Sequence, residues 1–304
     1  MSRVTPSSRQ NQMGGTRRTR VNSEETPVRE RVGEVLGEGV ARLEELDGGM
    51  VGTVHRVVLE SGETLVAKTG DTPLDVEARM LRYLARHTSF PVPAVEYADA
   101  EVLVLAHVPG DTEHSPSVER DAADHLAALH GHTAGAFGFP FDTLSGPLRQ
   151  PNRWCTSWVA FFGERRLGHV ADVAHEAGTV GDGTRERLAR VVSDLGALLD
   201  EPARPALVHG DVWTENVLSE GGAVTAFLDP ACYYGHPEVE LAYVAWTETF
   251  GDAFVERYRE RRPVAPGFEE RRRVYELLPL LEHVHLFGGR YRGLLDDALT
   301  RLGY

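Results

Sequence analysis

Apolar and polar residues alternate in two segments within the first third of the chain. In most of the rest, the apolar residues follow a helical spacing. The segments TVHRVVLE (53–60) and ETLVAK (63–68) alternate, which is typical of strands, and the Ser-Gly pair between them favours a hairpin. PLDVEARMLRYLARH (73–87) carries apolar residues along one helical face, and the apolar run VLVLAHV (102–108) predicts another strand. The order strand, strand, helix, strand predicts a small sheet-based unit.

Helical patterns dominate after this unit. SVERDAADHLAALHGHT (117–133) and TRERLARVVSDLGALLDE (184–201) are amphipathic, and helical spacing continues from about Val239 to the end. Short strands interrupt these helices within residues 206–230, where a Gly-Gly pair predicts a second hairpin. The order of elements predicts an α+β fold with a small β-rich N-lobe and a larger helical C-lobe.

The same pattern predicts three segments along the chain. The first is a disordered tail over residues 1–28, because its Ser, Thr, Arg, Asn and Gln content leaves too little aliphatic surface to offset the entropy of ordering. Residues 29–107 are expected to form the N-lobe, with a nucleotide-binding sheet and helix. Residues 108–304 are expected to form the C-lobe.

Composition and charge narrow the classes of function. The 304 residues hold 46 acidic and 32 basic side chains, for a formal net charge of -14, which argues against nucleic acid as a partner. No apolar run reaches the roughly 18 residues of a membrane helix, and the N-terminus lacks the apolar core of a signal peptide. The two cysteines, Cys155 and Cys232, lie far apart and suggest neither a zinc site nor a disulfide framework. We therefore expect a cytoplasmic protein with reduced thiols.

The most specific motif is VHGDVWTENVLSEGGAVTAFLDP, at residues 208–230. It places Asp211 and Asn216 five positions apart, then a hairpin, then Asp229 at the end of an apolar strand. Protein kinases use this arrangement: one carboxylate lies beside the nucleophilic hydroxyl, while an amide oxygen and a second carboxylate hold Mg²⁺ against the nucleotide phosphates. The alternative is that the His-Gly-Asp triplet is an ordinary turn and Asn216 bonds the loop backbone. The spacing favours a two-lobed protein-kinase-like fold.

Lys68 is the only lysine of the chain, so the 32 basic residues are one lysine and 31 arginines. It ends the second strand of the predicted hairpin, where kinases carry the lysine that contacts the nucleotide phosphates. An ammonium is a compact charge, whereas a guanidinium is a planar fork, so arginine is a poor substitute there. Glu77, in the following helix, is the predicted carboxylate partner, and Asp75 is the competing candidate.

Two further segments are expected to contact ATP. The loop DGGMVG between the first strands contains Gly48 and Gly49, which permit a close approach of the backbone to the phosphates. At the junction of the lobes, backbone groups of Ala106, His107 and Val108 are expected to meet the adenine edge.

These motifs resemble the fructosamine kinase (ketosamine 3-kinase) family of the protein-kinase-like superfamily. The resemblance is carried by LVHGDVWTENVL, FLDPACYYGHPEVELA, PGFEERRRVYELLPLLEHVHLFGGRY and LDGGMVGTVHRV, and it runs from about residue 30 to the C-terminus. It implies ATP- and Mg²⁺-dependent phosphorylation of the 3-hydroxyl of a ketosamine, either a small molecule or a glycated protein lysine, and hence a role in deglycation. It also implies that Asp211 is the base, that Asn216 and Asp229 bind Mg²⁺, and that Trp213 belongs to the sugar site. The alternative for Trp213 is a plug of the core beneath the loop.

Several positions depart from the family pattern. Met50 stands where cysteine is frequent, Glu215 lies in the catalytic motif, and Glu240 replaces an aspartate. Late in the chain, Glu282 and His285 stand where asparagine is usual. His283 and His285 are candidate sugar contacts, with ordinary structural histidines as the alternative.

Two other functions remain open at this point. One is a kinase for another hydroxylated amine, such as an aminoglycoside or a choline-like compound. The other is a pseudokinase that binds nucleotide as a scaffold, against which the joint presence of Lys68, Asp211, Asn216 and Asp229 argues.

Overall fold

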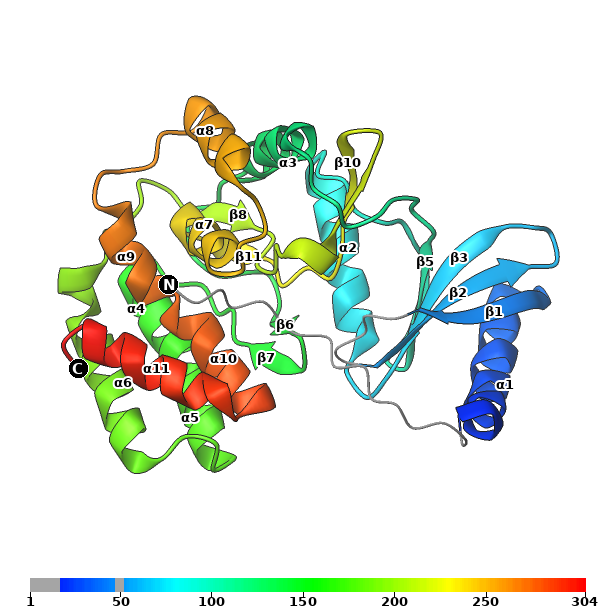
Figure 1. The fold of residues 1–304 in the computed structure, drawn as a ribbon, viewed down its shortest axis with the longest axis horizontal. Helices are drawn as coiled ribbons and strands as arrows, with labels where there is room; N and C mark the ends of the chain where they lie inside the picture. Colours follow the sequence, from blue (N-terminus) through cyan, green and yellow to red (C-terminus); the bar gives the residue numbers. More distant parts are fainter. Residues whose placement is uncertain (1–16, 47–51) are drawn as a thin grey trace.

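A computed structural model describes residues 17–46 and 52–304 of the chain. In Figure 1 a strand-rich lobe with one outer helix lies on the right, and a larger helical lobe lies on the left. Helix α2 stands between them. The predicted α+β, two-lobed architecture is confirmed.

The N-lobe contains one antiparallel sheet in the strand order β1-β2-β3-β5-β4. The predicted hairpin is β2–β3, in which Val54 lies opposite Lys68. Strands β1 and β4 complete the sheet beyond the three strands that the apolar pattern indicated. The bounds are β1 Val40–Leu46, β2 Thr53–Leu59, β3 Thr64–Thr69, β4 Val95–Ala98 and β5 Val102–Ala106.

Helix α1, Arg17–Leu36, covers one face of this sheet (Figure 1). Val28, Val32 and Leu36 pack against the sheet's buried residues, and Arg31 donates a hydrogen bond of 2.5 Å to Asp99 beyond β4. The predicted disordered tail over 1–28 is therefore wrong for residues 17–28, which are helical, while residues 1–16 lie outside the described residues. Composition did not predict this helix because the apolar residues that pack on the sheet lie only at its C-terminal end.

Helix α2, Leu74–His87, connects the two lobes by packing on both sides. Leu74, Ala78 and Leu81 contact the sheet face opposite α1, while Met80 and Leu84 belong to the core of the C-lobe. Because side chains alternate across a strand, Lys68 and Val66 share the face that α2 covers. This packing places Lys68 at the boundary between the lobes.

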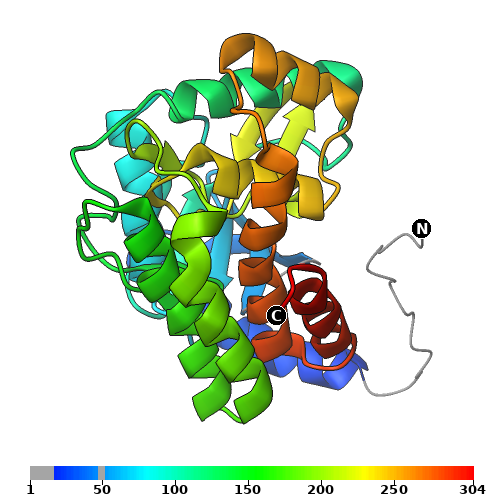
Figure 2. The same ribbon diagram turned by 90° about the vertical axis from the view of Figure 1, so that its left-hand side faces the viewer.

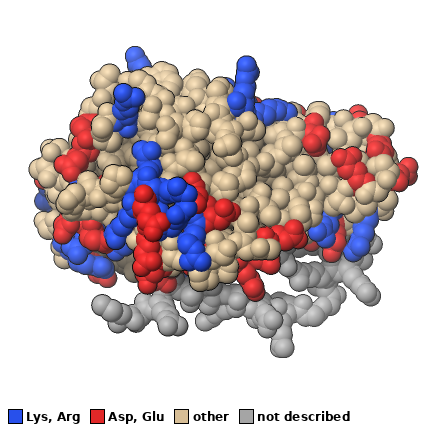
Figure 3. All heavy atoms as spheres, turned by 90° about the horizontal axis from the view of Figure 1, so that it is seen from above, with Lys and Arg blue, Asp and Glu red and all other residues tan. Residues whose placement is uncertain are grey.

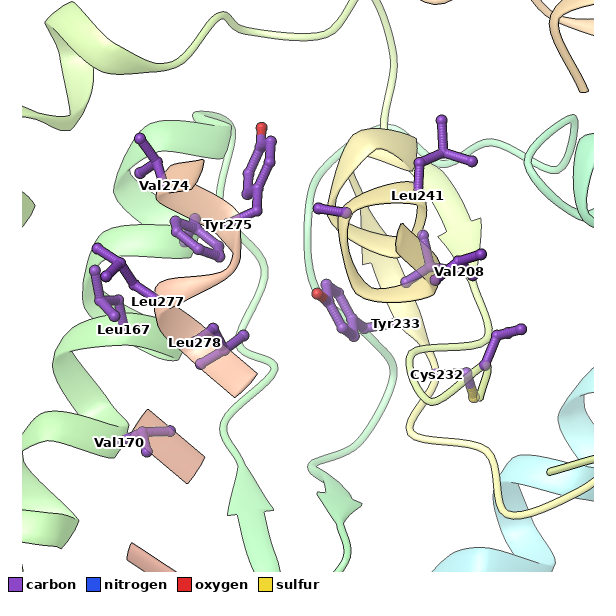
Figure 4. Close-up of a cluster of buried hydrophobic side chains, with 14 of the residues drawn as sticks. Leu167, Val170, Val208, Cys232, Tyr233, Leu241, Val274, Tyr275, Leu277 and Leu278 are labelled. Carbon is purple, nitrogen blue, oxygen red and sulfur yellow. The ribbon is translucent and has the colours of Figure 1, made fainter. Parts of the chain in front are cut away.

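The C-lobe is built from helices around one large apolar core, seen from its outer side in Figure 2. Figure 4 shows part of this core, where Leu167, Val170, Tyr275 and Leu278 lie on one side and Val208, Tyr233 and Leu241 on the other. The helices are α3 Pro116–Leu129, α4 Trp158–Phe162, α5 Gly168–Glu176, α6 Asp182–Leu198, α7 Pro237–Trp246, α8 Asp252–Arg261, α9 Phe268–Tyr275, α10 Leu277–Phe287 and α11 Arg290–Arg301. A π-helical turn, Gly163–Leu167, interrupts the passage from α4 to α5.

Three short strand pairs lie between these helices. They are β6–β7 (Thr143–Ser145 and Leu148–Gln150), β8–β11 (Ala206–Val208 and Tyr233–Gly235) and β9–β10 (Val217–Glu220 and Ala223–Phe227). The β9–β10 pair is the predicted second hairpin, with Gly221 and Gly222 at its turn. A short 3₁₀ turn, Thr214–Asn216, precedes β9. These pairs place the loops that carry the predicted chemistry at the lobe boundary.

The surface mixes charges of both signs. Figure 3 shows basic and acidic side chains next to each other on the face seen from above. Arg257 and Arg261 of α8, for example, both pair with Asp124 of α3. Among the described helices, none is long and apolar enough to cross a membrane. The two cysteines are free thiols, as predicted.

Candidate active site

The predicted catalytic loop leaves β8 in a sharp turn that only glycine permits. Gly210 has φ +89°, and a Cβ there would lie 2.4 Å from the carbonyl oxygen of Ala231. At the same point, a hydrogen bond of 2.8 Å from the Ala231 N–H to the His209 carbonyl holds the two segments together. The strand that follows Asp229 is therefore held against the loop that carries Asp211.

Asp211 is held from two directions. Its Oδ1 accepts a hydrogen bond of 2.8 Å from the Tyr243 hydroxyl, and its Oδ2 accepts one of 2.9 Å from the Asn216 amide. Asn216 also donates to the Asp211 carbonyl at 3.0 Å, so the loop bonding considered as the alternative for Asn216 is present beside the side-chain contact. Sequence reasoning missed Tyr243, which lies on α7 one turn after Glu240.

The environment of Asp211 raises the pKa of its carboxyl to about 7. Burial is the largest cause, and the negative charges of Asp229 and Glu240 add to it, while the bonds from Tyr243 and Asn216 act in the opposite direction. A carboxyl whose pKa lies near neutrality is suited to exchanging a proton with a substrate hydroxyl.

Glu240 organises the backbone of the catalytic loop. Its fully buried carboxylate accepts the N–H of Gly210 at 2.6 Å and that of His209 at 3.2 Å, and it lies 2.8 Å from Nε2 of His130. His130 in turn contacts the Tyr258 hydroxyl at 2.6 Å. Glu240, which stands where the family pattern has aspartate, therefore fixes the backbone of the catalytic loop.

Lys68 reaches two carboxylates at the lobe boundary. Its Nζ lies 2.8 Å from Oε1 of Glu77 and also bonds Oδ1 of Asp229. Burial disfavours the ammonium, but the charges of Asp229 and Glu77 outweigh that effect and raise the pKa of Lys68. The structure therefore pairs Lys68 with Glu77. No side-chain bond joins Asp75 to Lys68 in the described part of the chain. Asp229 has φ +53°, a strained conformation for a non-glycine residue.

The two predicted metal ligands have the donor atoms that Mg²⁺ prefers. The Asn216 amide nitrogen is used by Asp211, which leaves its Oδ1 available, and the Asp229 carboxylate is 47% exposed toward the cavity described next. Over residues 17–46 and 52–304, no group of three or more His, Cys, Asp or Glu side chains forms a metal site alone. One carboxylate and one amide fit a Mg²⁺ ion that takes its remaining oxygens from phosphates and water.

A cavity of about 350 Å³ joins these groups. Lys68, Glu77, Asp211, Asn216 and Asp229 all line it. Trp213 also lines it and is only half-buried, which favours the predicted sugar contact over a core plug. Glu215, by contrast, is exposed outside the cavity lining.

The two histidines of α10 differ. His283 lines the cavity; its Nδ1 lies 2.8 Å from the Pro279 carbonyl and its ring packs against Trp246 at 4.9 Å. His285 is absent from the lining, because two residues along a helix turn the side chain to another face. The cavity lining therefore gives no support to a sugar contact of His285.

The predicted nucleotide-binding loop is only partly visible. Gly48 and Gly49 lie outside the described residues. Gly52 is described, with φ +97°, and a Cβ there would lie 2.4 Å from the Thr69 carbonyl oxygen. This backbone approach holds the residue before β2 against the end of β3, next to Lys68.

The predicted hinge lies at the end of β5. The Ala106 N–H donates to the Ala94 carbonyl at 2.9 Å, and the His107 ring lies 2.8 Å from the Arg56 guanidinium. Ala106, His107 and Val108 do not line the cavity that holds Asp211, so their contact with adenine stays a prediction.

A family model for fructosamine kinase matches residues 30–302. Among curated proteins, a chloroplastic protein-ribulosamine 3-kinase of Arabidopsis thaliana is 28% identical, with 91% of this chain and 89% of that protein covered. A candidate ketoamine kinase of Pasteurella multocida is 32% identical, with 77% of this chain and 83% of that protein covered.

Solved structures agree with this assignment. A candidate fructosamine-3-kinase from Thermobifida fusca superposes with a TM-score of 0.79 at 32% identity, covering 90% of this chain and 97% of that one. The aminoglycoside phosphotransferase APH(4)-Ia, solved with AMP-PNP and hygromycin B, has a TM-score of 0.63 at 20% identity over 90% of this chain and 98% of its own, and shows a shared fold. The chain therefore belongs to the fructosamine kinase family, and it is a small-molecule phosphotransferase with a protein-kinase-like fold.

Proposed function

We propose that this protein transfers the terminal phosphoryl group of ATP to the 3-hydroxyl of a ketosamine. The observation that carries the proposal is the single cavity into which Asp211, the Lys68–Asp229 pair and Trp213 all project. It is supported by the relatives, which are named as ribulosamine 3-kinase and ketoamine kinase. The ketosamine is either a free adduct or a glycated protein lysine, and its phosphorylation would serve deglycation.

Asp211 acts as the base in this proposal. Its carboxylate accepts or orients the proton of the attacking hydroxyl, while Tyr243 and Asn216 hold its two oxygens in place. Glu240 fixes the backbone on which Asp211 sits, so that the reacting atoms keep their alignment. Trp213 and His283 shape the wall against which the sugar rests.

Lys68 acts on the phosphates of the nucleotide. Glu77 directs the ammonium, and Asp229 lies within reach of both the ammonium and the cavity. Asn216 and Asp229 would hold Mg²⁺, which neutralises charge on the phosphoryl group when it is bound. Gly48, Gly49 and the hinge residues Ala106, His107 and Val108 would contact the phosphates and the adenine. The proposed place of action is the cytoplasm, as the sequence predicts.

The test is a comparison of substrates. Release of ADP is measured with ribulose-lysine, fructose-lysine, an aminoglycoside and choline, and the product is analysed for a phosphate on the 3-hydroxyl. Turnover of ketosamines alone supports the proposal. Turnover of the aminoglycoside or choline alone would instead assign a kinase for another hydroxylated amine, and nucleotide binding without any turnover would assign a pseudokinase.

A further inference from the structure

Glu282 lies where the substrate cavity continues into a smaller buried one. The inner cavity measures about 40 Å³ and shares four lining residues with the outer one: Ser145, Asp211, Tyr243 and Glu282. Glu282 is therefore a neighbour of the proposed base on the wall that a substrate would touch. The proposed mechanism does not use it.

The Glu282 carboxyl has few hydrogen-bond or ion-pair partners within the protein. Its Oε2 accepts one long hydrogen bond of 3.5 Å from the Ser145 hydroxyl, and no ion pair of Glu282 occurs among the described residues. Arg166 also lines the inner cavity, but its two Nη atoms donate to the Pro151 and Arg165 carbonyls and to Asn152, and only its charge acts on Glu282. A carboxyl without a cation partner is costly to keep inside a protein.

Carboxyl groups outnumber basic groups around Glu282. Four carboxyl groups line the outer cavity, those of Glu77, Asp211, Asp229 and Glu282, against the single ammonium of Lys68. Burial and the charge of Asp211 raise the pKa of Glu282 to about 8, against the opposing effects of Arg166 and Ser145. The other titratable groups near it are the hydroxyls of Tyr243 from α7 and Tyr233 from β11 and, on its own helix, His283. A cation bound beside Glu282 would stabilise its ionised form against this burial.

We infer that Glu282 binds the amine nitrogen of the substrate and selects cationic amine adducts over neutral sugars. The inference rests on the proposed function. In a ketosamine only three carbon atoms separate the amine nitrogen from the 3-hydroxyl, so a hydroxyl placed at Asp211 brings the nitrogen to the neighbouring side chain. The protonated amine supplies the charge-assisted donor that Glu282 lacks.

The test uses a pair of substrates that differ in one atom. Fructosyl-methylamine carries the amine, and 1-O-methyl-fructose carries an ether oxygen in its place. For the wild type, kcat/KM should favour the amine by about 10- to 100-fold, the range of a charge-assisted hydrogen bond. If the ether turns over too slowly, its inhibition constant against the amine gives the same comparison.

Three variants separate recognition from structure. Glu282→Gln should raise KM for the amine by most of that factor and leave the ether unchanged, while Glu282→Asp should recover part of the preference. Glu276, at the start of α10 and outside both cavities, supplies the control, since Glu276→Gln should leave the substrate preference unchanged.

Two outcomes overturn the inference. An equal loss of kcat/KM with both substrates would make Glu282 a residue that positions Asp211. An unchanged preference of Glu282→Gln for the amine over the ether would show that the carboxyl does not contact the amine. If the wild type phosphorylates neither compound, the proposed function itself fails, which is distinct from a wild type that turns over ketosamine without any dependence on Glu282.

Discussion

Replacing Glu240 by Gln should damage both stability and turnover. The wild-type carboxylate accepts from two backbone N–H groups and lies beside His130, all through its two oxygens. A glutamine has one acceptor oxygen, so its NH₂ group must face either the Gly210 N–H or the His209 N–H. In each orientation a buried donor loses its acceptor at the base of the loop that carries Asp211.

The magnitude follows from these contacts. One buried unsatisfied donor and the lost charge assistance together amount to about 2–4 kcal/mol in the free energy of unfolding. With an unfolding entropy of about 2 cal/mol/K per residue over 304 residues, this lowers Tm by about 3–6 °C. Displacement of Asp211 on the order of 1 Å would lower kcat by up to about 10²-fold.

Glu238 provides the matched control for this experiment. It lies on the same helix and is also buried, but its carboxylate pairs with Arg271 at 2.6 and 2.7 Å, away from the loop. Thermal unfolding and ADP release are measured for both variants. We expect Glu238→Gln to lose stability while its kcat stays within about twofold, whereas Glu240→Gln loses both. A Glu240→Gln enzyme that melts early but keeps normal kcat would refute the positioning role.

Three further substitutions test the site. Lys68→Arg should retain the fold and lose most activity, because a planar guanidinium cannot replace the compact ammonium between Glu77 and Asp229; near wild-type ADP release would contradict this. Asp229→Asn should abolish turnover while the apo Tm hardly changes, since the Asp229 side chain is 47% exposed and Glu77 still pairs with Lys68; a large loss of apo stability would indicate a structural role instead. Glu282→Gln should gain stability relative to the wild type as pH rises from about 5 to 8, because a raised carboxyl pKa makes the folded wild type lose stability over that range; parallel Tm curves for the two proteins would rule this out.

The parts of the site that sequence alone predicted are those encoded in short segments. Asp211, Asn216 and Asp229 are set by one loop and one hairpin, and Lys68 by the strand that ends beside them. Local spacing is enough to bring Asp211, Asn216 and Asp229 together, whereas Lys68 reaches Asp229 across 161 positions because α2 packs on both lobes. The choice of Glu77 over Asp75 also followed from its position on the helix, and the structure agrees.

The parts that sequence missed depend on long-range packing. Tyr243 and Glu240 meet the catalytic loop only because α7 packs beneath it, although their i, i+3 spacing was a sign that both face the same side. The two-residue spacing of His283 and His285 already indicated that the two side chains face different sides of α10, and only His283 lines the cavity. Helix α1 was missed because its docking surface is formed by strands that follow it in the chain.

The central claim is that Asp211 is the base of a ketosamine kinase. The most direct measurement is the rate of ADP release by Asp211→Ala with fructose-lysine at saturating Mg-ATP, compared with the wild type. A fall in kcat on the order of 10² or more, with ATP affinity within a few-fold of normal, is the predicted result. Turnover at the wild-type rate would contradict the assignment.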